Sequence, residues 1–231
     1  MAELSDRAII ASWHKNAVPW VKAIANEEIE SRVAVTNQAV LDAVLKEKPI
    51  SLLDMGCGEG WLIRELVKAG VKCVGMDVVP KFAEHIQSAG AEFVELSYEE
   101  FSPDAFQKKF DLLVCNFSLL GKESVENVVA RSKELLNEEG ALIVQTIHPA
   151  EASTEENYVD GWREGNWSGF GDEFTNPAPW YFRSLESWKM LFEKAGYDNL
   201  SISEPRHPIT GKRHSVLFVA RVERQARIIF I

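Results

Sequence analysis

Between residues 50 and 148, short apolar runs of strand length alternate with longer segments whose apolar residues recur at helical spacing. Strands that alternate with helices are typical of parallel βαβ units, which bind ligands at the carboxyl ends of the strands. We therefore predict an α/β fold with a doubly wound, mostly parallel sheet. The predicted strands are 50–54, 72–76, 91–95, 110–115 and 141–147, followed later by 199–203 and 213–222.

Glycines mark the ends of several predicted helices. Gly70, Gly90, Gly140 and Gly196 each follow a helical pattern. Glycine is preferred just beyond a helix because it adopts the left-handed conformation without a Cβ penalty. We expect all four to end helices.

Residues 1–48 precede the first strand and form a predicted helical arm. From Val33, apolar residues fall on one helical stripe, which continues to Leu45. Pro19 is expected to separate two short helices in the earlier part. Trp13 and Trp20 in this part fit either a lid over a ligand site or a helical extension that packs on the core.

Residues 149–183 interrupt the alternation of strands and helices. Their prolines and glycines exclude a long regular element, yet the segment is too rich in aromatic residues for disorder. It leaves the sheet after the fifth strand, at the ligand edge, where a long structured loop is usually functional. We predict an aromatic-rich insertion that acts as a lid; the alternative is a loop that closes over its own small core.

Composition narrows the class of protein. The 231 residues correspond to one domain with room for an insertion, and 46% apolar with 26% charged residues is typical of a soluble protein. The formal charge of −10 disfavours nucleic-acid binding. No apolar stretch approaches a membrane span, and the start lacks the pattern of a secretory signal. Three widely spaced cysteines indicate neither a disulfide framework nor a metal site, so we expect a reduced, cytoplasmic protein.

One stretch carries the pattern of a ligand site. The first strand ends in Asp54, and Gly56, Gly58 and Gly60 alternate with other residues before the next helix. Such a turn lets a ligand approach the backbone closely. The second strand leads into Asp77, where an acid can accept hydrogen bonds from the hydroxyls of a ribose. Together these features predict a nucleotide-type site, although the glycine turn alone would also fit an ordinary βα connection.

The glycine spacing distinguishes two cofactor families. Nicotinamide-binding folds carry G-x-G-x-x-G, whereas residues 56–60 read G-x-G-x-G after Asp54. This resembles the first motif of the class I S-adenosylmethionine-dependent methyltransferases. The resemblance continues through Asp77, residues 96–99, the fourth-strand segment 110–117 and residues 135–142.

The resemblance implies a Rossmann-like methyltransferase domain over residues 49–222, with a seven-stranded sheet whose last strand is antiparallel. It implies S-adenosylmethionine as cofactor and S-adenosylhomocysteine as product. In this family the glycine turn packs against the methionine part of the cofactor, and the acid after the second strand holds the ribose. The implied cofactor residues are Asp54, Gly56, Cys57, Gly58, Gly60, Asp77, Val78, Ser97, Tyr98, Asn116 and Phe117, with Arg32 as a candidate for the cofactor's carboxylate.

The acceptor is predicted only as a class. Family members that methylate nucleobases or exocyclic amines often carry Asn/Asp-Pro-Pro-aromatic after the fourth strand, whereas residues 116–119 read Asn-Phe-Ser-Leu. This departure and the acidic charge favour a small-molecule acceptor, as in bacterial small-molecule methyltransferases, which the whole chain resembles. An oxidoreductase of the NAD type and a non-catalytic protein that binds an adenosyl cofactor remain as alternatives. The oligomeric state and the tail 223–231 stay open.

Candidates for catalysis come from the edge of the predicted pocket. His148 follows the fifth strand and suits proton transfer near neutral pH. It fits equally well a strand end at which the imidazole hydrogen-bonds to the backbone. The candidate substrate or lid residues, which would alternatively only pack, are Trp13, Trp20, Tyr158, Trp162, Tyr181 and Arg183.

Overall fold

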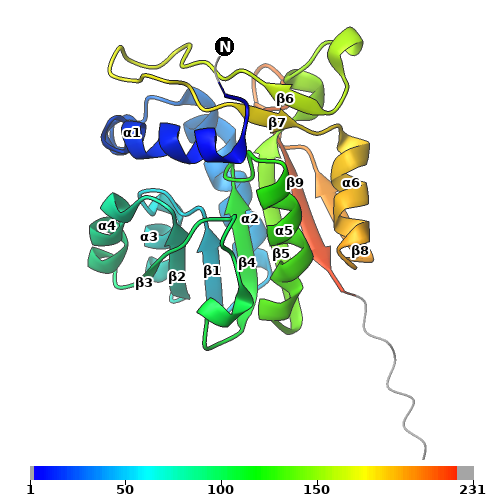
Figure 1. The fold of residues 1–231 in the computed structure, drawn as a ribbon. Helices are drawn as coiled ribbons and strands as arrows, with labels where there is room; N and C mark the ends of the chain where they lie inside the picture. The colour runs from blue at the N-terminus through cyan, green and yellow to red at the C-terminus, as the bar shows by residue number, and fades with distance from the viewer. Residues whose placement is uncertain (1–2, 223–231) are drawn as a thin grey trace, which may run out of the picture.

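The computed structural model describes residues 3–222, so the tail 223–231 lies outside the described residues. Seven strands form one sheet in the order β3-β2-β1-β4-β5-β9-β8 (Figure 1). The neighbours from β3 to β5 pair in parallel, and β9 pairs antiparallel with both β5 and β8. The predicted fold class is therefore confirmed. The strands are β1 Ser51–Met55, β2 Lys72–Asp77, β3 Glu92–Glu95, β4 Phe110–Asn116, β5 Leu136–Ile147, β8 Asn199–Ser203 and β9 Ser215–Arg221.

Helices cover both faces of the sheet. Figure 1 shows α5 and α6 in front of the strands and α2 behind them. Within the described residues, no helix has both the length and the apolar character needed to cross a membrane. The helices are α1 Asp6–Ala25, a π-helix Arg32–Thr36, α2 Asn37–Lys46, α3 Trp61–Lys68, α4 Ala83–Ser88, α5 Glu123–Ser132 and α6 Leu185–Lys194, with 3₁₀ turns at Pro80–Phe82, Pro103–Ala105, Lys133–Leu135, Pro149–Glu151 and Glu155–Asn157.

Consecutive residues of β4 belong to two different hydrophobic cores. Leu113 and Cys115 pack in the core that contains residues of α5 and α6, whereas Leu112 and Val114 pack in the core that contains residues of α2 and α3. Side chains of a strand point alternately to the two faces of a sheet, and both faces are covered here. For this reason the strand reads in the sequence as a continuous apolar run.

The arm differs from its prediction at Pro19. This proline lies inside α1, which continues without a break over 20 residues. Proline removes the hydrogen bond to the carbonyl four residues earlier, that of Lys15, and its ring crowds this carbonyl. Lys15 is exposed, so water can reach this carbonyl. The apolar face of α1 packs on the core on both sides of Pro19 and keeps the helix continuous.

The apolar stripe predicted from Val33 to Leu45 is only partly correct. Val40 and Val44 are fully buried, but Val33 is 53% exposed and Leu45 is 38% exposed. The π-helix before α2 has a wider turn than an α-helix, so it shifts which side chains face the core. The same turn places Arg32 beside the cavity described below.

Three of the four predicted helix-ending glycines have the expected conformation. Gly70, Gly90 and Gly196 have positive φ angles directly after helices. The prediction was wrong at Gly140, which lies within β5 because that strand starts at Leu136. A Cβ on Gly140 would lie 3.0 Å from the carbonyl oxygen of Asp111. This glycine therefore permits a close approach of two strands.

The insertion leaves the sheet after β5 and crosses its carboxyl end beside α1 (Figure 1). It contains a two-stranded antiparallel hairpin, β6 Gly161–Arg163 and β7 Trp180–Phe182. Both additions to the sheet, the arm and the insertion, thus lie at the edge where α/β folds bind ligands.

Candidate functional site

The turn between β1 and α3 is folded tightly over the end of β2. The backbone N–H groups of Gly56 and Cys57 both donate to the carbonyl oxygen of Met76, at 2.7 and 3.0 Å. Gly56 has a φ angle of +71°, and a Cβ at this position would lie 2.4 Å from the Cβ of Ser118. Gly58, with φ +54°, has only the indole nitrogen of Trp20 near its own Cβ position, at 3.5 Å. The turn therefore needs glycine for its shape at Gly56 and leaves open space beside Gly58.

Asp77 connects the end of β2 to this turn. One carboxylate oxygen accepts from the N–H of Gly58 and the other from the N–H of Val79, both at 2.9 Å. Burial raises the pKa of Asp77 to about 6, against the opposing effect of these backbone hydrogen bonds. The carboxylate is thus fixed in orientation at the carboxyl end of the strand, as its predicted role requires.

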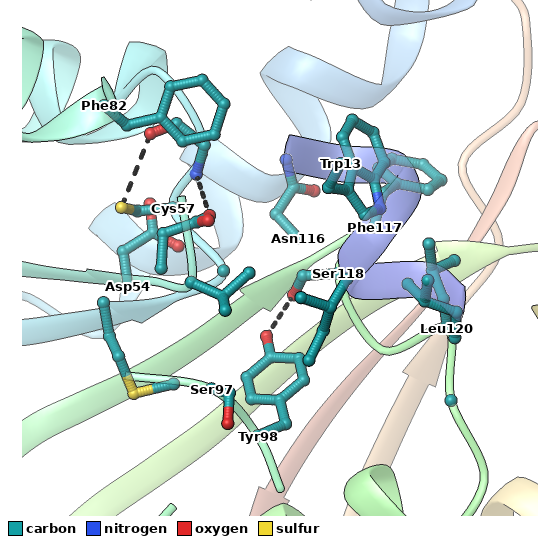
Figure 2. A pocket seen from close by; sticks show the side chains of 18 of the residues that line it. Trp13, Asp54, Cys57, Phe82, Ser97, Tyr98, Asn116, Phe117, Ser118 and Leu120 are labelled. Atoms are coloured by element: carbon teal, nitrogen blue, oxygen red, sulfur yellow. Dashed lines mark hydrogen bonds between the residues drawn. The ribbon is translucent and has the colours of Figure 1, made fainter. Parts of the chain in front are cut away.

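A cavity of about 240 Å³ lies where these elements meet α1. Figure 2 shows Asp54, Cys57 and Phe82 on one side of it and Trp13, Phe117 and Leu120 on the other, with Ser97 and Tyr98 between them. Of the predicted cofactor residues, all except Gly60 line this cavity, and of the predicted substrate residues Trp13 and Trp20 do so. Leu96 and Glu99, from the segment 96–99 of the resemblance, line the cavity as well. The lining residues that the sequence did not single out are Asp6, Ile9, Ile10, Glu59, Trp61, Met76, Phe82, Ser118, Leu120, Gly121 and Ser124.

Two buried polar atoms at this cavity have no hydrogen-bond partner. One is Oδ1 of Asp54, whose residue is 2% exposed, and the other is Nη2 of Arg32. Burial, together with the carboxylates of Asp77 and Glu59, raises the pKa of Asp54 to about 8. Burial also lowers the pKa of Arg32, whose guanidinium lies over the rings of Trp20 and Trp61. Buried polar groups are normally satisfied, so these atoms fit a ligand that carries both a cationic and an anionic group.

Residues from the end of β4, the loop after it and the loop after β3 lie together at the cavity. The Tyr98 hydroxyl lies 2.7 Å from the Met55 carbonyl oxygen and 2.8 Å from the Ser118 hydroxyl, which donates to the same carbonyl. Phe117 has a φ angle of +54°, which is rare for a residue with a side chain. Asn116 accepts a hydrogen bond from the Gln145 side chain at 2.8 Å. The backbone strain at Phe117 is thus located at the wall of the cavity, as is common at functional sites.

The comparisons with known proteins agree with this geometry. A family model described as a methyltransferase domain matches residues 27–202. The chain belongs to this family. The resemblance to S-adenosylmethionine-dependent methyltransferases, predicted from the glycine turn and Asp77, is therefore confirmed.

Curated relatives match this chain over part of its length. The ubiquinone biosynthesis O-methyltransferase of Pelagibacter ubique (strain HTCC1062) is 31% identical over 110 residues, which cover 44% of this chain and 43% of the relative. The malonyl-(acyl-carrier protein) O-methyltransferase of Halalkalibacterium halodurans is 27% identical over 115 residues, which cover 45% and 41%. The chain thus spans less than half the length of these relatives.

Solved structures match this chain over more of its length. An S-adenosylmethionine-dependent methyltransferase of Mesorhizobium loti covers 79% of this chain and 96% of its own, with a TM-score of 0.62 and 17% identity. The 1,6-didemethyltoxoflavin-N1-methyltransferase of Burkholderia thailandensis, solved with 1,6-didemethyltoxoflavin and S-adenosylhomocysteine bound, covers 96% and 92%, with a TM-score of 0.63 and 17% identity. At this identity the likeness shows the fold.

The aromatic insertion of the methyltransferase packs on the outer side of α1. The cavity-lining residues, all within the described part of the chain, include none from 149–183. The amide of Asn16, which is fully buried, donates to the Thr175 carbonyl at 2.7 Å and accepts from the Thr175 N–H at 2.9 Å. The ring of Trp167 contacts that of Trp13 edge to face at 6.0 Å. The insertion therefore supports the helix that covers the cavity.

Replacing Asn16 with alanine should loosen this support. The Thr175 N–H would lose its acceptor and the Thr175 carbonyl would keep only the indole N–H of Trp167. Each lost hydrogen bond costs roughly 0.5–1.5 kcal/mol of unfolding free energy. Hydrogen exchange at residues 167–176 should become faster, and denaturant unfolding measures the loss. Lys22→Met is the matched control, because it removes only an exposed ion pair with Glu173 in the same segment. Equal effects of the two substitutions would contradict the assignment to Asn16.

Four of the predicted substrate residues are not brought to the cavity. The Tyr158 hydroxyl accepts from the Leu185 N–H at 3.0 Å, and the Trp162 ring packs on that of Tyr181. Arg183 is 5% exposed. Its guanidinium donates to the carbonyl oxygens of residues 121 and 122 and lies over the Tyr181 ring. These side chains pack the insertion against the loop after β4. This agrees with the alternative noted from the sequence, in which they only pack.

His148 does not line the cavity either. Its Nδ1 accepts from the N–H of Ala150 at 3.2 Å, so the proton of the neutral ring is on Nε2, which lies 3.1 Å from a carboxylate oxygen of Glu204. The residue is 2% exposed. This geometry corresponds to the alternative noted from the sequence, an imidazole that ends the strand by bonding to the backbone.

We expect His148→Asn to change stability and to leave methyl transfer unchanged. The asparagine oxygen can replace Nδ1 as an acceptor for the Ala150 N–H. Oε1 of Glu204 loses its hydrogen bond, at a cost of roughly 0.5–1.5 kcal/mol, while Oε2 keeps its ion pairs with Arg206 and Arg213. Unfolding in denaturant and the dependence of kcat on pH are the measurements. A large fall in kcat together with the loss of one limb of the pH profile would show that His148 transfers a proton after all.

Proposed function

We propose that this methyltransferase transfers a methyl group from S-adenosylmethionine to a small-molecule acceptor. The observation that carries the proposal is the placement of Asp77, fixed by the N–H of Gly58, at the same cavity as the unpartnered atoms of Asp54 and Arg32. An adenosyl amino acid presents ribose hydroxyls, an ammonium and a carboxylate, and these are the groups that such a set of side chains binds.

The roles of the cofactor residues follow from their charges and positions. Asp77 accepts hydrogen bonds from the ribose hydroxyls, and Val78, Ser97 and Tyr98 line the cavity beyond it, where the adenine is expected. Asp54 compensates the positive charge of the amino acid part, and Arg32 binds its carboxylate. The turn residues Gly56, Cys57, Gly58 and Gly60 shape the backbone around that part, and Asn116 and Phe117 separate it from the acceptor.

The bound cofactor supplies an activated methyl group on its sulfonium, and the protein supplies orientation and exclusion of water. Proximity and orientation contribute ~7–11 kcal/mol in favourable cases. Ile9, Ile10 and Trp13 of α1 line the cavity and present an apolar cover over it. A cover of this kind keeps water from the reacting atoms. Trp20 extends the cover from the same helix.

Calorimetric titration tests the proposal. S-adenosylhomocysteine should bind with micromolar affinity and NAD should not bind measurably at the same concentrations. Binding of NAD alone would favour the oxidoreductase. Binding of S-adenosylhomocysteine without turnover of any acceptor in a broad panel, together with a stoichiometric protein partner, would favour a non-catalytic role.

We also propose a cellular location and a class of partner for the protein. Cys57, Cys73 and Cys115 are all free and buried, which supports a reducing location such as the cytoplasm. The acidic charge supports a small-molecule partner over nucleic acid. Within residues 3–222 no group of three potential ligands is arranged to hold a metal, and the prediction of metal-independent transfer stays a prediction.

A further inference from the structure

Charged side chains along the cavity are mostly acidic. Among the described residues that line it, five are aspartate or glutamate and one is arginine. Glu59 is neutralised by an ion pair with Arg64 at 2.8 Å. The raised pKa values of Asp54 and Asp77 reflect burial in the first place, with a contribution to Asp54 from neighbouring carboxylates. A bound cation therefore relieves repulsion in this cavity, and a bound anion adds to it.

The end of the cavity opposite the glycine turn carries apolar side chains, the hydroxyl of Ser124 and one carboxylate. Figure 2 shows Trp13, Phe117 and Leu120 at this end, away from Asp54 and Cys57. Asp6 lines the cavity there, at the start of α1. Asp6 is hydrogen-bonded to Lys122 and Ser124, which follow Leu120 in the chain.

The carboxylate of Asp6 is held in place by hydrogen bonds and can still accept one from a ligand. Oδ1 accepts from the Lys122 N–H at 2.9 Å and the Ser124 hydroxyl at 2.8 Å, and Oδ2 accepts only a long bond of 3.4 Å from the Ser124 N–H. A carboxylate has about four lone-pair sites, so Oδ2 can accept another hydrogen bond. The N-terminus of α5, at which Asp6 lies, stabilises a negative charge.

The arginines of the insertion, Arg163 and Arg183, already donate hydrogen bonds to backbone carbonyls and do not line the cavity. Arg183 donates to the backbone carbonyls of Gly121 and Lys122 in the same loop. Arg163 donates to backbone carbonyls within the insertion. Within residues 3–222, Arg32 is the one basic residue that lines the cavity, and it lies at the glycine-turn end. An acidic acceptor would thus lack a counter-charge.

We propose that the acceptor is a small amine with an apolar body, and that Asp6 binds its nitrogen while Ile9, Ile10, Trp13 and Leu120 contact the body. The inference rests on the proposed methyltransferase function and names the substrate class of the same site. Asp6 acts here as a specificity-determining residue, because its charge favours a cationic acceptor over a neutral or anionic one of equal size. The bound ammonium passes one N–H proton to the Asp6 carboxylate, and the lone pair that this frees forms the N–CH₃ bond as the S–CH₃ bond of the sulfonium breaks.

The test uses three probes of matched size and different charge. The protein saturated with S-adenosylhomocysteine is titrated at pH 7 with phenethylamine, 2-phenylethanol and 3-phenylpropionate, and binding is followed by ligand-observed NMR. The amine should bind about tenfold or more tighter than the alcohol, a difference of about 1.4 kcal/mol, and the carboxylate should bind more weakly than both. Asp6→Asn should abolish the preference for the amine, because it removes the charge and keeps an acceptor oxygen.

Ser124→Ala is the matched control for this substitution. It removes one hydrogen bond to Asp6 and keeps its charge, so the preference for the amine should persist even if α1 is held less firmly. Equal or tighter binding of the carboxylate, an unchanged preference in Asp6→Asn, or no binding of any probe would overturn the inference. If S-adenosylhomocysteine itself fails to bind the wild-type protein, the proposed function fails; if it binds and the amine is not preferred, only the assignment of the acceptor fails.

Discussion

Asp54→Asn is expected to make the cofactor-free protein more stable at pH 8 and to weaken its binding of S-adenosylhomocysteine. Asp54 is 2% exposed, and its Oδ1 has no hydrogen-bond partner. Burial, with the repulsion of Asp77 and Glu59, raises its pKa from the ordinary 3.8 to about 8. At pH 8 folding must therefore bury a charge that the unfolded chain exposes to water. Asparagine has nearly the same shape and carries no charge.

The dependence on pH follows from proton linkage. Because the folded-state pKa of Asp54 exceeds the unfolded value, the folded protein binds a proton that the unfolded chain releases between pH 4 and 8. The stability that this proton provides is complete below about pH 4 and is lost as the pH rises to about 8. At about 1.4 kcal/mol per pH unit, the loss over this range amounts to several kcal/mol. The substituted protein should lack this loss, so the difference between the two proteins should grow with pH.

Urea unfolding of both proteins between pH 5 and 8, with calorimetric titration of S-adenosylhomocysteine at pH 7, measures the two effects. Asp111→Asn is the matched control. Burial of Asp111 opposes its ionisation, but hydrogen bonds from Asn137, Ser51 and Ile50 hold its pKa below the ordinary value. Asp111 does not line the cavity, so this control should lower stability at pH 8 and leave ligand affinity unchanged. A wild-type-like pH profile for Asp54→Asn would show that Asp54 ionises freely in the folded protein.

Local sequence was sufficient to predict which residues meet at the glycine-turn side of the cavity. Short-range rules predict the turn at 56–60 and the position of Asp77. Glycine permits the positive φ angles of a tight turn between strand and helix, and parallel strands end at the same edge of the sheet. Gly58 and Asp77 are consequently joined by a hydrogen bond of 2.9 Å. The same rules placed Asn116 at the end of the neighbouring strand.

The proposed acceptor side depends on contacts between distant segments, which spacing in a single sequence does not reveal. Asp6 lies more than a hundred residues from Ser124, to which it bonds. The structure shows how closely the two segments approach: a Cβ on Gly121 would lie 1.7 Å from a carboxylate oxygen of Asp6, so a larger residue at 121 would displace this side chain. The role of His148 was left open between proton transfer and a strand end for a similar reason, because its partner Glu204 comes from the loop before β9.

Asp77→Ala should weaken the binding of S-adenosylhomocysteine by about tenfold to a hundredfold. A hydrogen bond to a charged group contributes ~1.5–3 kcal/mol, and the ribose offers two hydroxyls. Part of the loss would be structural, because Asp77 also accepts from the N–H groups of Gly58 and Val79. Asp77→Asn separates the two contributions, since its amide oxygen can still accept one of these backbone bonds.

A double-mutant cycle with 2′-deoxy-S-adenosylhomocysteine isolates the ribose contact. If Asp77 binds the 2′-hydroxyl, removal of that hydroxyl weakens binding to the wild-type protein and has little effect on Asp77→Asn, which is the signature of direct coupling. Because burial raises the pKa of Asp77 to about 6, wild-type affinity should also fall as the pH drops through 6, and the substitution should remove that part of the dependence. Equal losses from the deoxy ligand in both proteins would place the ribose elsewhere in the cavity, since a carboxylate that does not touch the hydroxyl cannot couple to it.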